Sequence, residues 1–220
     1  MNAKSTASGS RRNLLLLALC LPVLAGCFGA AAVGVGAGAL VLTDRRISET
    51  YITDQGIELR AGNRIDEKYR DKIHVNVTSY NRMLLLTGEV PTAEIKADVE
   101  KIAAGVNDVK SISNELAIAG PSSFGVRSND SYITSKVKAR FIDANKFSAN
   151  VVKVVTEAGV VFLLGIVTQA EADAAVEIAR TTGGVLKVVR VFEIISPQQA
   201  ATPNKTASPA QPETKPAPAK

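Results

Sequence analysis

The chain has 220 residues, of which 46% are apolar and 21% are charged, with a formal net charge of +5. It contains one histidine and two cysteines, and these follow neither the nucleophile–base arrangement of a hydrolase nor the spacing of a metal centre. No phosphate-binding loop is present either. The sequence therefore argues against the common classes of enzyme, and we expect no catalytic residue, no cofactor and no metal site.

The N-terminal segment has the three parts of a secretory signal. Its positively charged residues are Lys4, Arg11 and Arg12. An apolar run from Leu14 to Leu24 follows, which is too short to span a bilayer. The next residues, Ala25-Gly26-Cys27, complete a Leu-Ala-Gly-Cys sequence that resembles the lipobox of bacterial lipoproteins. The resemblance implies that a signal peptide, 1–26, is removed and that the thiol of Cys27 carries lipid, which palmitate labelling detects.

The mature chain would then keep a single sulfur atom. Cys20 lies inside the discarded signal, so no internal disulfide is possible. Phe28 follows the lipobox, and the absence of aspartate at this place favours the outer membrane of a diderm bacterium. An alternative interpretation joins Leu14 to Leu42 into one uncleaved membrane anchor, although Pro22 interrupts that run.

Low-complexity segments lie on both sides of the middle of the chain. Residues 28–42 are rich in Gly, Ala and Val, which predicts a spacer near the membrane headgroups, and we place the spacer and the lipidated cysteine at 27–45. Residues 197–220 hold six of the nine prolines and are expected to form a disordered tail. The net positive charge belongs to the signal and this tail. The middle is neutral, which argues against a nucleic-acid partner.

The middle repeats itself with an offset of 77 residues, from Val75 and Val152 through Gly88 and Gly165. In each copy two apolar runs flank a polar turn, which predicts a β-hairpin. A helix precedes each hairpin, and a second helix and a last strand follow it. The predicted helices are 53–65, 93–104, 131–143 and 170–181, and the predicted last strands are 109–116 and 185–192. The expected fold class is α+β, with two αββαβ units, each a small mixed sheet packed against helices.

The hairpins carry further expectations. Gly88 and Gly165 are expected to end their strands and to allow close backbone approach. Asn81 is expected in the left-handed conformation, since Arg82 follows it where glycine is more usual. His74 falls on the polar face of its strand. It has no Asp, Glu or Cys at a useful spacing, so we expect a surface residue without a catalytic role.

The repeated segments resemble the BON domain. The resemblance is carried by the strands LLLTGEV and FLLGIV, by the segments IAAGVNDV and IARTTGGV, and by the αββαβ order. Two such domains behind a lipobox are similar to the dual-BON outer-membrane lipoproteins of the DolP/YraP family, to which OsmY-like proteins are related. The resemblance implies BON domains at 46–119 and 128–196.

One helix of the second copy carries an aromatic residue and two cations spaced by four. These residues are Tyr132, Lys136 and Arg140, and we expect Asn129 or Asp130 to cap the helix start. From the residues alone, a solvated helix face with a half-buried tyrosine is the favoured interpretation. The resemblance implies phospholipid binding, because an aromatic residue of this helix enters the membrane in the relatives. Tyr132 stands where a close relative has tryptophan.

The expected function is that of a lipoprotein anchored to the periplasmic face of the outer membrane. It would bind anionic phospholipid through the second domain and support envelope integrity. Two alternatives stay open. One is an assembly accessory that contacts an envelope protein through the first domain, and the other is an osmotic-stress chaperone of the OsmY kind. Neither the oligomeric state nor the packing of the two domains follows from the sequence.

Overall fold

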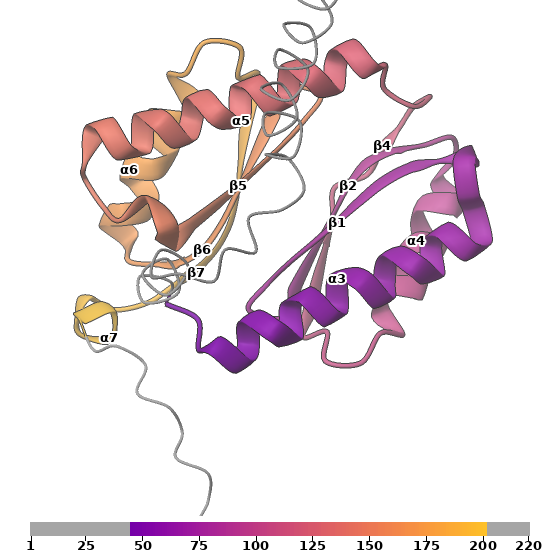
Figure 1. The fold of residues 1–220 in the computed structure, drawn as a ribbon, viewed down its shortest axis with the longest axis horizontal. Coiled ribbons are helices and arrows are strands. Elements are labelled where there is room, and N and C mark those ends of the chain that lie inside the picture. The colour runs from indigo at the N-terminus through magenta and orange to yellow at the C-terminus, as the bar shows by residue number, and fades with distance from the viewer. Residues whose placement is uncertain (1–44, 202–220) are drawn as a thin grey trace, which may run out of the picture. The chain divides into compact units, whose positions relative to one another are not determined.

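The structure, a computed structural model, describes residues 45–201 (Figure 1). The signal segment, Cys27, the spacer before residue 45 and the tail after residue 201 lie outside the described residues. All contacts reported below belong to one compact unit of the chain, Leu42–Lys220.

The first repeat forms a small mixed sheet with two long helices. Its elements are α3 (Ser48–Tyr69), η2 (Arg70–Lys72), β1 (His74–Tyr80), β2 (Met83–Val90), α4 (Ala93–Ala104), β3 (Ser111–Asn114) and β4 (Ala117–Ile118). Strand β2 is central, because it pairs antiparallel with β1 and parallel with both β3 and β4. The predicted last strand, 109–116, contains β3, whereas the short β4 follows just beyond it.

The second repeat has the same order of elements. They are α5 (Phe124–Ala144), η3 (Ala149–Val151), β5 (Val152–Glu157), β6 (Val160–Val167), α6 (Gln169–Arg180), β7 (Lys187–Ile194) and α7 (Pro197–Ala201). Strand β6 pairs antiparallel with β5 and parallel with β7. The α+β prediction with two mixed sheets is confirmed. Helix α7 extends the regular structure five residues into the segment that was expected to be tail.

The first helix of each repeat is longer than predicted. Helix α5 begins at Phe124, and its N-cap is Ser123, whose side chain accepts a hydrogen bond from the Val126 amide. The expectation that Asn129 or Asp130 caps this helix is therefore wrong, since both lie inside it. Serine is a preferred N-cap, because its hydroxyl accepts from an amide that the helix leaves unpaired.

Both hairpin turns use the left-handed conformation at two successive residues. In the first hairpin these residues are Asn81 (φ 52°) and Arg82 (φ 65°), and in the second Ala158 (φ 47°) and Gly159 (φ 77°). Positive φ at both central residues defines the type I′ turn, whose twist matches that of the strands. The expectation for Asn81 is confirmed, and Arg82 shares the conformation.

A buried aspartate on the preceding helix holds the first turn. Asp54 is fully buried, and its carboxylate accepts hydrogen bonds from the amides of Asn81 and Arg82 and from the Ser79 hydroxyl, all at 2.7–2.8 Å. Arg46 neutralises the charge with an ion pair at 2.8 Å. The two amides have no partner within a type I′ turn, so the carboxylate satisfies donors that burial would otherwise make costly.

The second domain repeats this device. Asp130, on α5, accepts hydrogen bonds from the amides of Ala158 and Gly159, both at 2.8 Å. The residue expected to cap a helix instead caps the hairpin turn.

Gly88 and Gly165 lie within their strands and do not end them, contrary to the prediction, but the expected close approach is present. A Cβ atom on Gly88, whose φ is 113°, would lie 2.1 Å from the His74 carbonyl oxygen. On Gly165 it would lie 2.5 Å from the Val151 carbonyl oxygen. Both positions therefore require glycine, because no side chain fits against the neighbouring backbone.

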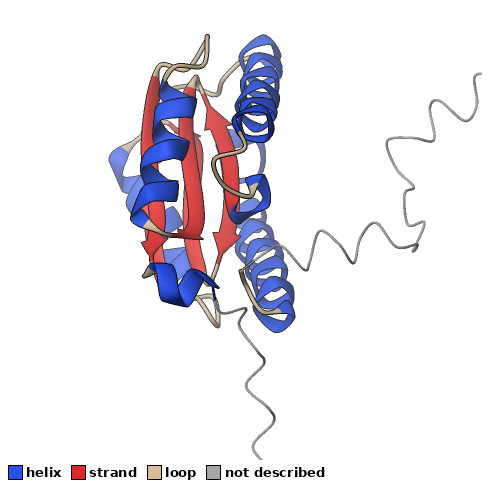
Figure 2. Cartoon of the chain, turned by 90° about the vertical axis from the view of Figure 1, so that its left-hand side faces the viewer, coloured by secondary structure: helices blue, strands red, loops and turns tan. Residues whose placement is uncertain are grey.

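In each domain the helices cover one face of the sheet, as Figures 1 and 2 show. The core of the first domain combines α3 and α4 with inward residues of β2, such as Leu84 and Leu86. The core of the second domain combines α5 and α6 with inward residues of β6, such as Val161 and Leu163.

A third apolar cluster contains residues from the opposite faces of both sheets. Its fully or nearly buried members are Tyr80, Leu85, Phe162, Leu164, Ile166 and Val191. Successive residues of β2 and of β6 thus alternate between the cluster under their helices and this shared cluster. A strand that is buried on both faces reads as a continuous apolar run, which explains the LLL and VVFLL segments.

Candidate functional site

Tyr132 lies on the exposed side of α5. Its side chain is 62% exposed, and the Lys136 ammonium lies 4.7 Å from its ring centroid. Another side of the helix packs into the core through Ile133, Val137 and Phe141. The structure therefore brings together the aromatic ring and the first of the two cations, in a cation–π arrangement.

Arg140 has a different environment from Tyr132. Its guanidinium donates to the Ile178 carbonyl at 3.0 Å and to the Thr182 hydroxyl at 2.8 Å. Lys136 also donates to a carbonyl in this region, that of Gly183. The last carbonyls of a helix lack partners within it and carry a partial negative charge, so cations near the end of α6 are stabilising. Arg140 thus joins α5 to α6.

The loop after α6 packs beside this part of α5. A Cβ atom on Gly184 would lie 3.2 Å from Ile133 and 3.8 Å from the Lys136 ammonium. Leu186, in the same loop, is 79% exposed. We call Tyr132, Lys136 and Leu186 the α5 surface. The sequence analysis did not identify Leu186 as exposed, because it placed this residue inside the predicted last strand, 185–192. In the structure β7 begins only at Lys187.

Three further large apolar side chains on α5 are exposed, of which Val126 is the least so, at 40%. Phe124 is 80% exposed at the helix start, and Ile142 is 66% exposed near its end. Across residues 45–201, no helix is long and apolar enough to cross a membrane.

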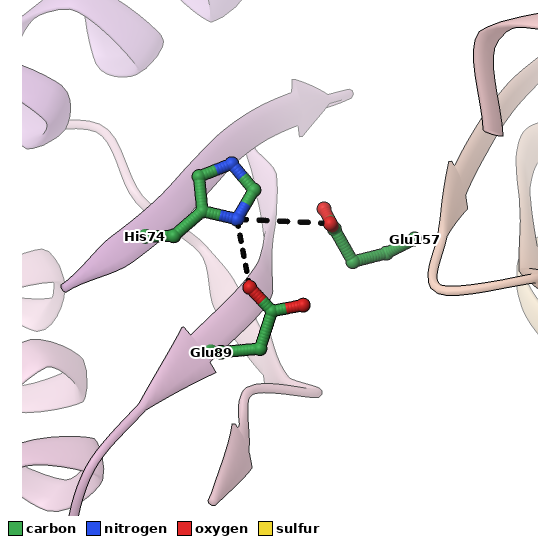
Figure 3. Close-up of side chains that lie close together, drawn as sticks. All are labelled: His74, Glu89 and Glu157. Carbon is green, nitrogen blue, oxygen red and sulfur yellow. Dashed lines mark hydrogen bonds and ion pairs between the residues drawn. The ribbon is translucent and has the colours of Figure 1, made fainter. Parts of the chain in front are cut away.

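His74 takes part in a second group of polar side chains, shown in Figure 3. Its Nδ1 atom lies 2.9 Å from Glu89 Oε2 and 3.8 Å from Glu157 Oε1. Glu89 is its cross-strand neighbour on β2, whereas Glu157 ends β5 of the other domain. Both glutamate side chains are less than a tenth exposed.

Neighbouring donors hold the two carboxylates in place. The Ser122 amide donates to Glu89 Oε2 at 3.1 Å, and the Asn76 amide group donates to Glu157 Oε2 at 2.7 Å. Burial raises the pKa of Glu157, and this outweighs the lowering by Asn76 and His74. The carboxylates of Glu89 and Asp130 raise that pKa further.

The expectation that His74 is a plain surface residue is therefore wrong. No acidic residue lies close to His74 in the sequence. Glu89 meets it across the first hairpin, and Glu157 meets it from the second domain. The register of the first hairpin was the one available signal, since it places Glu89 opposite His74.

Two ion pairs also lie near the domain boundary. Lys153 on β5 lies 2.8 Å from Glu58 on α3. Arg45, the first described residue, makes paired hydrogen bonds to both carboxylate oxygens of Glu171 at 2.7 and 2.8 Å and donates to the Ile166 carbonyl. The Arg45 hydrogen bond is the main reason that the pKa of Glu171 falls to about 2.

Comparison with known proteins identifies the repeated unit. The BON domain matches residues 53–120 and 129–196. The chain is 38% identical over 174 residues to the outer membrane lipoprotein DolP of Haemophilus influenzae, which covers 78% of this chain and 90% of that protein.

Two other relatives are similar over shorter stretches. The 21 kDa hemolysin of Actinobacillus pleuropneumoniae is 35% identical, over 69% of this chain and 79% of that protein. The osmotically-inducible protein Y of Escherichia coli is 32% identical, over 52% of this chain and 58% of that protein. With two matched domains that span most of its described residues, the chain belongs to the BON domain family.

Proposed function

We propose that this protein is a lipoprotein of the outer membrane, anchored through Cys27, that binds anionic phospholipid with the α5 surface of its second domain and supports envelope integrity. The lipobox and the identity to a protein named an outer membrane lipoprotein support the anchor and its location. Incorporation of labelled palmitate into the wild-type chain, and its loss in Cys27→Ser, tests the anchor separately.

The observation that carries the lipid-binding proposal is the exposure of Tyr132 beside Lys136. A tyrosine ring has an apolar body and a polar hydroxyl, which suits the headgroup region of a bilayer. A cation at the same place attracts anionic lipid, with about 1 kcal/mol per lysine near the surface. Leu186 adds an exposed apolar side chain in the loop that follows α6.

Arg140 has a supporting role in this proposal. Its guanidinium is bonded to the end of α6, so it fixes the loop that carries Leu186 and adds positive charge beneath the surface. Membrane contact is assigned to Tyr132 and Lys136.

Flotation with lipid vesicles tests the proposal. The unit 42–220, which lacks the proposed anchor, is mixed with vesicles of phosphatidylcholine alone or with added phosphatidylglycerol. We expect binding only to the anionic vesicles. Tyr132→Ala should weaken it, and Lys136→Gln should weaken it by roughly fivefold, which corresponds to about 1 kcal/mol.

Ile142→Ala is the matched control, because Ile142 is equally exposed on the same helix but lies outside the α5 surface. Equal binding to both kinds of vesicle, or equal losses in Tyr132→Ala and Ile142→Ala, would contradict the proposal.

A second candidate function is contact with an envelope protein through the first domain. Ile52 and Leu59 favour it, because they lie seven residues apart on one side of α3 and are 70% and 65% exposed. Crosslinking in cells that recovers a partner independently of Tyr132 but not with Leu59→Ser would support this candidate.

A further inference from the structure

The group formed by His74, Glu89 and Glu157 has the chemistry of a transition-metal site. It offers one imidazole nitrogen and two carboxylate oxygens, a set of ligands that Zn²⁺ accepts in proteins. The three residues come from β1, β2 and β5, so the donors are carried by strands and not by free loops.

The geometry is close to that of a metal-bound state. One ligand atom from each residue can be chosen so that all three lie within 4.8 Å of one another. Ligand atoms of a tetrahedral zinc ion, with bonds of about 2.0–2.1 Å, lie about 3.4 Å apart. The His74–Glu89 distance of 2.9 Å would lengthen slightly and the His74–Glu157 distance of 3.8 Å would shorten slightly.

The charge balance favours a cation. Among residues 45–201, no lysine or arginine forms an ion pair with Glu89 or Glu157, and His74 is their single basic partner. Two buried carboxylates near one another are costly unless a positive charge compensates them. A divalent cation would supply it.

The surroundings resemble those of metal sites in general. Ser122 and Asn76 donate hydrogen bonds to oxygens of the two glutamates, as residues behind metal ligands usually do. A cavity of about 340 Å³ gives access from solvent, and its lining includes His74, Glu157, Asp130 and one cation, Arg127, which forms no ion pair with either glutamate among the described residues. It leaves room for water as the fourth ligand.

We propose that His74, Glu89 and Glu157 bind one Zn²⁺ ion, which links the first hairpin of the first domain to the hairpin turn of the second. The site is separate from the α5 surface, and it does not depend on the lipid-binding proposal.

The chain allows an unambiguous test, because His74 is its single histidine. The full chain is purified in detergent without a histidine tag, labelled with ¹⁵N in the imidazole, and titrated with Zn²⁺. We expect the Nδ1 resonance of His74 to shift and saturate at one ion per chain. No shift, or a shift confined to Nε2, would overturn the proposal.

Variants locate the other two ligands. His74→Gln, Glu89→Gln and Glu157→Gln should each weaken Zn²⁺ binding by at least tenfold in a competition titration with a chromogenic chelator. Glu58→Gln is the matched control, since it removes a glutamate that pairs with the other domain through Lys153 and should leave Zn²⁺ affinity unchanged.

Zn²⁺ affinity that is unaffected in Glu157→Gln, or equally lowered in Glu58→Gln, would overturn the proposal. The histidine titration uses the wild-type chain, so it decides the question even if a variant does not fold.

Discussion

At the scale of single residues, the role of the two buried aspartates could not be predicted from the sequence. Asp54 and Asp130 each hold a hairpin turn whose amides lie 27 to 29 residues later in the sequence. Neither aspartate is part of a local motif. Their role depends on how a helix packs against a hairpin, and periodicity within one element carries no information about that.

Asp54→Ala should lower the free energy of unfolding by about 3–5 kcal/mol, because it removes the buried carboxylate that pairs with Arg46 and accepts hydrogen bonds from the turn amides. Urea denaturation followed by circular dichroism measures this. Asp66→Ala, an exposed position on the same helix, is the control and should change the free energy by less than about 0.5 kcal/mol. Similar losses in the two variants would contradict the assigned role of Asp54.

At the scale of elements, the sequence predicts the order and type of the helices and strands well. The 77-residue repeat places both hairpins correctly, and the predicted 93–104 helix coincides with α4. The first helices were predicted too short because α3 and α5 extend beyond the amphipathic stretch, with exposed residues at their starts. Amphipathic periodicity detects only the part of a helix that packs against the core.

Two glycines of the first domain should respond oppositely to alanine. Gly88→Ala should destabilise the protein by roughly 2–6 kcal/mol, because the new Cβ would collide with the His74 carbonyl at a positive φ. Gly62→Ala should stabilise it by about 0.5–1 kcal/mol, because Gly62 lies inside α3 with nothing within 4 Å of a Cβ atom. Thermal denaturation of the two variants compares them directly, and a destabilised Gly62→Ala would refute the prediction.

At the scale of the whole described chain, the contact between the two sheets is what sequence analysis could not predict. The residues in the shared cluster have ordinary strand patterns, and nothing in either repeat identifies the other as its partner. The continuous apolar runs of β2 and β6 do indicate that both faces of each sheet are covered, because a strand with one solvated face would alternate apolar and polar residues. The same contact between the domains brings Glu157 to His74, so the polar group of His74, Glu89 and Glu157 could not be predicted without it.

The Arg45–Glu171 pair should make stability depend on pH in acid. The pKa of Glu171 is about 2 in the folded protein, compared with an ordinary value of 4.5. A lowered folded-state pKa gives stability that is complete above about 4.5 and is lost as the pH falls toward 2, because the unfolded chain binds the proton first.

Arg45→Ala should cost roughly 1.5–3 kcal/mol at neutral pH, since it removes a charged, paired hydrogen bond. The difference from wild type should shrink as the pH falls through this window, as urea denaturation at each pH would reveal. Arg180→Ala removes an exposed pair with Glu177 and serves as the control, with little effect at any pH. A constant difference between Arg45→Ala and wild type would refute the linkage.

The position of Arg45 also has a mechanical consequence. Although the first domain follows Arg45 directly in sequence, this residue is fastened to Glu171 and to the Ile166 carbonyl of the second domain. A pull on the N-terminal side of the chain would therefore load the second domain before it reached α3. A force applied through the N-terminal segment would therefore be distributed over both domains. From the order of the sequence alone, it would be expected to act on the first domain only.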